Sequence, residues 1–196
     1  VQQIDPATGA ATGVPVPSPI NPARALAYDP ATDHFWAANW DSNLYEFTRA
    51  GAIVNTFSPV GLSSYGMAWD SWSAGGPYLW LWSQDGPDPL LMASQVNPTT
   101  GALTGISFLG VGVAGEMAGG AAISDQVVPG VVTFLGMNQG VSDRVGVYEL
   151  AIAQTDEIPW LSEMPFQGSL GMGECVTAGV TFDSTGLTAG LYTGFL

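Results

Sequence analysis

The chain has 196 residues, of which 46% are hydrophobic, and its mean hydropathy is +0.24. A sequence this apolar is long enough to bury a core, which excludes global disorder. The chain has seventeen acidic side chains but only three arginines and no lysine, so the formal net charge is -14. Nucleic acid is excluded as a partner because its phosphates need clustered basic residues. No apolar span is long enough to cross a membrane, so we expect no transmembrane segment.

The chain opens near a turn signal that recurs later. DPATGA at residues 5–10 and NPTTGA at 97–102 are near copies, each with Pro at the first central turn position and Gly where a positive φ is favoured. The segment FTRAGAIVNTF at 47–57 occupies the same phase between them. Each of these three segments therefore predicts a β-hairpin.

Strand-like runs recur between the hairpin signals, and helical periodicity is nearly absent. Each repeat begins with a short run that ends in Asp, continues with an aromatic or apolar run, and finishes with a third run. These runs lie at 25–29, 34–40 and 44–47, at 67–70, 78–84 and 90–96, and at 119–125, 131–137 and 145–152. Four short strands repeated about every 40–50 residues are typical of β-propeller blades.

The repeat predicts an all-β fold with about three and a half four-stranded blades. We expect a half blade at 1–20, blades at 21–62, 63–113 and 114–155, and a β-propeller region spanning 1–155. Known propellers need at least about four blades to close a ring. The chain is therefore expected to be a piece of a larger protein, or a protomer whose missing surface another copy supplies.

The blade-like part also resembles a known group of proteins. ALAYDPATDHFWAANWDSNLYEFTRAG at 25–51 is similar to blades of secreted bacterial β-propellers, and the resemblance extends over residues 1–155. It implies the propeller fold and an extracellular or cell-surface location. It implies no particular activity, because this fold carries many unrelated functions.

The repeat of strand-like runs ends near Thr155, and we expect residues 156–196 to form a second region. The motifs Trp160-Leu161-Ser162, Thr181-Phe182-Asp183 and the Gly-rich segment 185–194 resemble the bacterial immunoglobulin-like modules of the BACON and choice-of-anchor kind. This resemblance implies the first part of a β-sandwich, without its closing strand. An unfinished sandwich exposes a strand edge that favours pairing with another chain.

Few residues suit covalent or metal chemistry. The only histidine, His34, is predicted to be a solvated turn residue, because its neighbour Asp33 would point to the opposite face of a strand. With one histidine and no nucleophile elbow, Ser-His-Asp catalysis and a zinc site are not expected. The single cysteine, Cys175, excludes an internal disulfide and is expected to be a partly exposed thiol. Without a nearby base it is not expected to act as a nucleophile.

Acidic and amide side chains at the blade turns are candidate ligands for calcium. They are ordinary turn formers as well, and would bind calcium only if several loops bring them together, because calcium takes about six to eight oxygen ligands. A general acid and base pair among them is the other chemical interpretation. The residues concerned are Asp41, Asn43, Asp85, Asp88 and Asp125.

Six of the seven tryptophans lie in the two clearest repeats. Trp80 and Trp82 share one face of a predicted strand, and the default interpretation of the strand tryptophans is core packing between blades. Trp40 and Trp72 stand beside polar turns and are expected to be exposed, where they could stack on carbohydrate. The predicted ligand-binding residues are Trp40, Asp41, Asn43, Trp72, Asp85 and Asp88.

These features favour a non-catalytic binding, spacer or assembly segment that acts through loop faces and β-edge pairing. Its expected partners are other domains of the same polypeptide, other copies of itself, or carbohydrate, and no cofactor apart from calcium is expected. The alternative is a fragment of a secreted glycan-processing propeller enzyme, or an accessory region of a secreted peptidase. Carboxylates with shifted pKa values beside Trp40 or Trp72 would favour the enzyme. Scattered turn carboxylates and buried tryptophans would favour the binding role.

Overall fold

The computed structural model describes residues 1–13, 15–128, 131–150, 160–164, 175, 177 and 179–190. These residues form fifteen strands in several antiparallel sheets and no helix, which confirms the all-β prediction for the described part of the chain. The chain divides into two compact units, residues 1–152 and 153–196. Each described sheet is open, with an edge strand on both sides.

The first sheet contains four consecutive antiparallel strands. Buried and exposed residues alternate along its first strand, which therefore presents one face to a core. The carboxylate of Asp29 ends that strand by accepting the Ala31 amide at 2.9 Å, as expected of an Asp before a turn. The strands are β3 (Ala25–Asp29), β4 (His34–Ala38), β5 (Leu44–Thr48) and β6 (Ile53–Phe57), in that order across the sheet.

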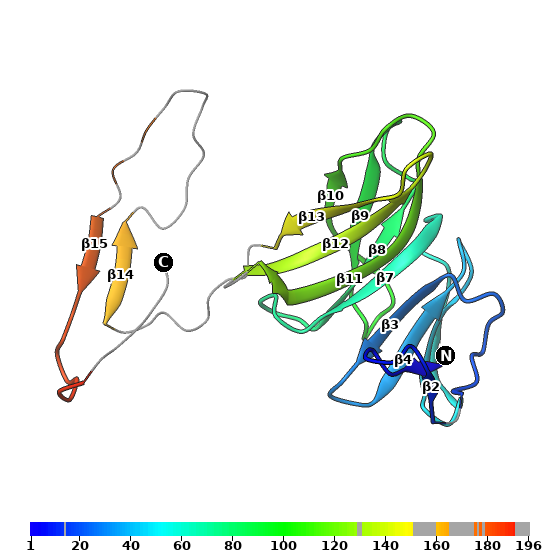
Figure 1. Cartoon of the computed structure of the whole chain (residues 1–196), viewed down its shortest axis with the longest axis horizontal. Coiled ribbons are helices and arrows are strands. Elements are labelled where there is room, and N and C mark those ends of the chain that lie inside the picture. The colour runs from blue at the N-terminus through cyan, green and yellow to red at the C-terminus, as the bar shows by residue number, and fades with distance from the viewer. Residues whose placement is uncertain are drawn as a thin grey trace. The chain divides into compact units, whose positions relative to one another are not determined.

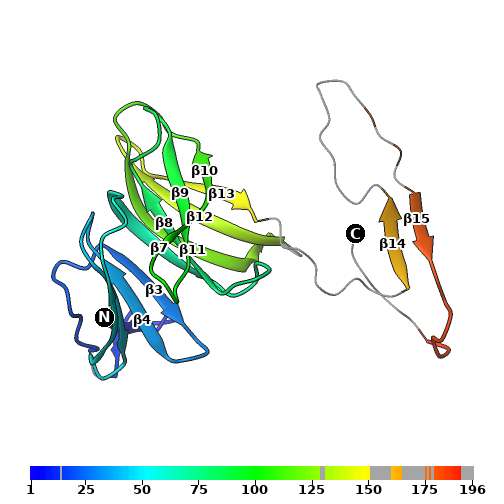
Figure 2. The ribbon, with the colours of Figure 1, turned by 180° about the vertical axis from the view of Figure 1, so that it is seen from behind.

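The second and third sheets repeat this arrangement of neighbouring antiparallel strands. Strands β3, β7 and β11 are each the first edge strand of their sheet and lie side by side in both views (Figures 1 and 2). The second sheet contains β7 (Ser64–Asp70), β8 (Tyr78–Ser83), β9 (Leu91–Val96) and β10 (Leu103–Gly110). The third contains β11 (Met117–Val128), β12 (Val131–Gln139) and β13 (Arg144–Glu149).

The core of the first unit lies between these sheets. Leu79 and Leu81 face the first sheet, where they pack with buried residues such as Trp36. Trp80 and Trp82 point to the opposite face and pack against Phe134 of the third sheet. The predicted alternation along residues 80–82 is therefore confirmed, as is the burial of Trp36, Trp80 and Trp82.

An N-terminal hairpin covers the outer face of the first sheet. Its strands are β1 (Gln3–Ile4) and β2 (Ala11–Thr12), and it lies beside β4 (Figures 1 and 2). The following residue Val16 packs on Phe35, Ala37 and Phe47, which form a small buried cluster on that face. The hairpin is therefore a two-stranded sheet that stacks on the outer face of the first sheet.

The second unit contains the antiparallel pair β14 (Leu161–Met164) and β15 (Gly179–Phe182). Two motifs identified in the sequence meet here, because Leu161 lies opposite Phe182. The Trp160 ring stacks on Phe182 with ring centroids 6.5 Å apart. Phe182 nevertheless remains 72% exposed, and Cys175 is an exposed free thiol, as predicted.

Candidate functional site

Several loops gather where strands β3, β7 and β11 begin, and we call this region the loop end. The Trp40 amide donates to the Ser64 carbonyl at 3.2 Å, which joins the β4–β5 loop to the start of β7. The Ser63 amide donates to the Asp85 carboxylate at 2.8 Å, which joins the β8–β9 loop to the same place. The loop end therefore holds one predicted tryptophan and one predicted carboxylate close to the same short segment.

Trp40 is the most exposed aromatic side chain of the loop end. Half of its surface is exposed, and its φ of 47° lies in the left-handed region that few non-glycine residues adopt. The Arg24 guanidinium lies over the ring, 5.3 Å from its centroid, and the Tyr65 ring lies 5.8 Å away. The expected exposure of Trp40 is thus confirmed, and Arg24 places a positive charge over the indole ring.

The six predicted ligand-binding residues do not form one site. Trp72 is 39% exposed, as expected, but it follows the far end of β7 and so lies at the opposite end of the sheet from Trp40. Asp41 and Asp88 are exposed and Asn43 is half-buried. Within the described residues, no three His, Cys, Asp or Glu side chains gather as metal ligands would. The geometry therefore brings Trp40 and Asp85 near one segment and leaves Trp72 apart.

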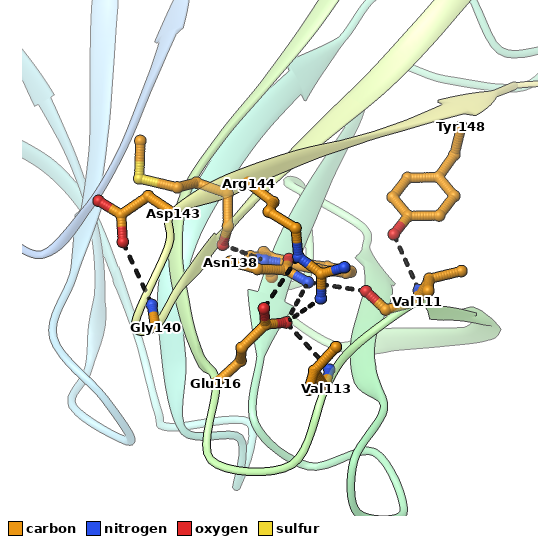
Figure 3. Close-up of polar contacts among 10 residues, drawn as sticks. Val111, Val113, Glu116, Asn138, Gly140, Asp143, Arg144 and Tyr148 are labelled. Atoms are coloured by element: carbon orange, nitrogen blue, oxygen red, sulfur yellow. Dashed lines mark hydrogen bonds and ion pairs between the residues drawn. The ribbon is translucent and has the colours of Figure 1, made fainter.

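A polar cluster fixes the 111–116 loop at this end (Figure 3). The Glu116 carboxylate accepts hydrogen bonds from the Val113 amide at 3.0 Å and from both Arg144 Nε and Nη2, at 2.9 and 2.6 Å. The Asn138 amide donates to the Val111 carbonyl at 2.7 Å. These contacts hold the loop against β12 and β13, so the cluster positions the loop end and offers no free charge to a ligand.

The carboxyl groups with altered pKa values are all shifted downward among the described residues. Hydrogen bonding from Arg49 lowers the pKa of Asp33 to about 2. Arg144 lowers the pKa of Glu116, and the backbone amide of Ala7 lowers that of Asp5. A general acid at neutral pH needs the opposite shift. These carboxylates instead stay ionised and bind cationic or N–H groups.

The structure corrects the prediction for His34. This residue begins strand β4, its side chain is 22% exposed, and its Nδ1 atom lies 2.7 Å from Glu46 Oε1. The second carboxylate oxygen of Glu46 accepts from the Asn55 side-chain amide at 2.6 Å. The prediction of a solvated turn histidine was wrong because it considered only neighbours in sequence, whereas Glu46 is brought close by the pairing of β4 with β5.

Sequence reasoning did not identify Arg24, Tyr65 or a cavity beneath the N-terminal hairpin. Arg24 follows only from the pairing of β3 with β4, because its amide donates to the Ala38 carbonyl, two residues before Trp40. The cavity has a volume of about 790 Å³ and lies between the hairpin and the outer face of the first sheet. It depends on a sheet-to-sheet packing distance, which no sequence pattern reports.

The chain matches no protein-family model, and no curated protein matches it significantly. Among the residues that the structure describes, no helix is long and apolar enough to cross a membrane.

Proposed function

We propose that this chain is a non-catalytic binding, spacer or assembly segment of a larger secreted or cell-surface protein. In this proposal residues 1–155 are blades of a β-propeller, and residues 156–196 are part of an immunoglobulin-like module. The chain acts by offering sheet faces, strand edges and the loop end to other domains, to other copies of itself, or to carbohydrate.

The observation that carries the proposal is the apolar outer face of the third sheet. Val145 and Val147 on β13 are 55% and 47% exposed, and Met137 on β12, opposite Val145, is 37% exposed. The other face of these strands packs on Trp82, so this one points away from the second sheet. Clustered apolar side chains on a sheet face mark an interaction surface.

The packing of the three sheets supports the propeller interpretation. They stack through large buried side chains, and their first strands β3, β7 and β11 lie side by side (Figure 1). Blades arranged around an axis have both properties. The outer face of the third sheet would then receive a further blade.

The distribution of charge and aromatic residues favours binding over catalysis. Trp36, Trp80 and Trp82 are buried between sheets, and Trp40 and Trp72 lie at opposite ends. The altered carboxyl pKa values are lowered by hydrogen-bond donors. Scattered turn carboxylates of this kind support structural roles for the acidic residues.

The proposal is tested by comparing the intact mass of the native polypeptide with the size of its particle in solution. We expect a polypeptide longer than 196 residues, a particle larger than one chain, or both. A native polypeptide of this length that sediments as a monomer and retains no partner would overturn the proposal.

A surface variant makes the same test specific. Val147→Lys places a charge in the apolar outer face, so it should weaken assembly and leave folding intact. Val141→Lys is the matched control because Val141 is fully exposed in the loop between β12 and β13. Equal effects of the two variants would show that the outer face is not the interface.

A further inference from the structure

Arg24 differs from the other two arginines in having no acidic partner within the described part of the chain. The other two form ion pairs, with Asp33 and with Glu116. Arg24 is exposed and forms no ion pair with a described residue. The chain has seventeen acidic side chains for its three arginines, so an acidic partner for each would be easy to supply. The Arg24 guanidinium therefore keeps its hydrogen-bond donors for an anion from outside.

The backbone positions both Arg24 and the Trp40 ring beneath it. The Arg24 amide donates to the Ala38 carbonyl at 3.2 Å, and the guanidinium lies 5.3 Å from the centroid of the Trp40 ring. Trp40 lies in a tight turn closed by two hydrogen bonds. The Ser42 amide donates to the Asn39 carbonyl at 2.9 Å, and the Asn39 amide donates to the Ser42 hydroxyl at 2.8 Å. Because the ring and the guanidinium are held in place beforehand, ordering them costs little when a ligand binds.

Two aromatic rings beside the guanidinium offer an apolar surface. Trp40 is half exposed, and the partly exposed Tyr65 ring lies 5.8 Å away with its plane inclined by 52°. Aromatic faces of this kind pack well against the C–H groups of a ligand. A second cation on this surface would be repelled by Arg24. The surface therefore fits a ligand that has an apolar face and a negative charge at its edge.

Two exposed carboxylates near the rings can accept hydrogen bonds from hydroxyl groups. Asp41 follows Trp40 in the same turn. Asp85 accepts the Ser63 amide through Oδ2, and its Oδ1 atom accepts no hydrogen bond from a described residue. Both carboxylates would repel a further negative charge, as would the net charge of -14. The matching ligand therefore carries hydroxyl groups and one negative charge rather than many.

We propose that Arg24, Trp40 and Tyr65 bind a sugar ring with a single carboxylate, that is, a uronic acid within an otherwise uncharged glycan. The carboxylate pairs with Arg24, and the C–H face of the sugar packs on Trp40 and Tyr65. Hydroxyl groups of the sugar donate to Asp41 and Asp85. These five residues lie between positions 24 and 85, so the first two four-stranded sheets and their loops build the whole site. This inference rests on the proposed binding function and names the class of carbohydrate for it.

Methyl β-glucuronide and methyl β-glucoside are matched probes, because they differ only in a carboxylate in place of a CH₂OH group. Titrated into the ¹⁵N-labelled 196-residue chain, the glucuronide should shift the indole N–H signal of Trp40. The glucoside should bind at least about tenfold more weakly, because it lacks the charged hydrogen bonds to Arg24. The Trp40 signal is the one missing from the spectrum of Trp40→Asn, a substitution that suits the left-handed turn. A glucuronide that does not shift this signal, or that binds no more tightly than the glucoside, overturns the inference.

Variants of the arginines separate the proposed contact from the general effect of charge. Arg24→Gln should abolish the preference for the glucuronide, whereas Arg49→Gln removes the same charge outside the site and should leave the preference unchanged. Arg24→Lys keeps the charge without the paired donors, so its preference should be intermediate. Trp40→Asn should weaken the binding of both sugars, because both pack on the ring. Thermal unfolding of each variant checks that the fold is retained, and equal effects of Arg24→Gln and Arg49→Gln would overturn the site.

An acidic peptide is the other source of a single carboxylate, and a third probe distinguishes it. The α-amide of N-acetylglutamate presents one carboxylate without a sugar ring, so it should bind at least about tenfold more weakly than the glucuronide. Equal binding would assign the site to a polypeptide side chain and overturn the proposed sugar. None of these results involves the outer face of the third sheet, so the assembly proposal is still judged by the native mass and the Val147→Lys variant.

Discussion

The Arg144 guanidinium and the Glu116 carboxylate form a two-point ion pair, with Nε 2.9 Å from Oε1 and Nη2 2.6 Å from Oε2. The two residues are 28 positions apart in sequence, so the pair closes the 111–116 loop onto β13. Paired hydrogen bonds between a guanidinium and a carboxylate are directional, and the contact therefore fixes geometry as well as charge.

Glu116→Gln should lower the melting temperature at neutral pH, and the difference should disappear in acid. Arg144 lowers the pKa of Glu116 in the folded chain below its usual value of 4.5, so ionisation favours folding. The stabilisation is complete above about that pH and is lost as the pH falls through the folded-state pKa. Thermal unfolding of both proteins between neutral pH and acid measures this. Asp41→Asn, which removes an exposed carboxylate, is the control, and an undiminished difference in acid would contradict the prediction.

Trp82→Phe should destabilise the first unit by about 1–3 kcal/mol, because it removes buried volume and leaves the Met137 carbonyl without the indole N–H that lies 2.9 Å away. Gly136→Ala should cost a similar amount, because its Cβ would lie 2.7 Å from the same ring. Urea unfolding provides the free energies. Trp72→Phe, at a 39% exposed site, should change stability by less than about 0.5 kcal/mol. A comparable loss in that control would contradict the assignment of the core.

Local patterns in the sequence were sufficient to predict that the chain forms β-strands, because each strand carries a signal of its own. Alternation places Trp80 and Trp82 on one face, and the Pro and Gly of NPTTGA mark the turn before β10. Such signals depend only on residues that are near one another in the chain. The all-β fold and the buried tryptophans were therefore predictable.

The contacts of the candidate site were not predictable because they depend on strand register and on packing between sheets. Glu46 reaches His34 only when β4 and β5 pair, and Arg144 reaches Glu116 only when β13 lies beside the 111–116 loop. The separation of Trp40 from Trp72 could have been deduced, since one follows a second strand and the other follows a first strand of neighbouring antiparallel sheets.

Glu46→Ala should destabilise the first sheet by about 1–3 kcal/mol. The buried carboxylate accepts from Asn55 at 2.6 Å and contacts His34 at 2.7 Å, so its removal leaves two polar groups without their partner. Glu149→Ala removes an exposed carboxylate from the edge strand β13 and serves as the control. Chemical unfolding measures both. Equal small effects would show that the Glu46 network adds nothing to stability.

The two copies of the turn allow backbone strain to be separated from packing. Gly9 and Gly101 both have φ of 70°, but a Cβ at Gly9 would meet nothing within 4 Å, whereas one at Gly101 would lie 2.2 Å from the Phe57 ring. Gly9→Ala should therefore cost about 1–2 kcal/mol for the left-handed conformation alone. Gly101→Ala should cost that amount and about 1–3 kcal/mol more for the clash.

Urea unfolding of the two glycine variants tests this difference, and a double-mutant cycle assigns its cause. In a Phe57→Ala background, Gly101→Ala should cost close to what Gly9→Ala costs, because the ring that it strikes is gone. If Gly101→Ala is as mild as Gly9→Ala in the unaltered protein, the contact between the β9–β10 turn and the first sheet is not part of the stable fold. Packing would then constrain the β9–β10 turn no more than it constrains the β1–β2 turn.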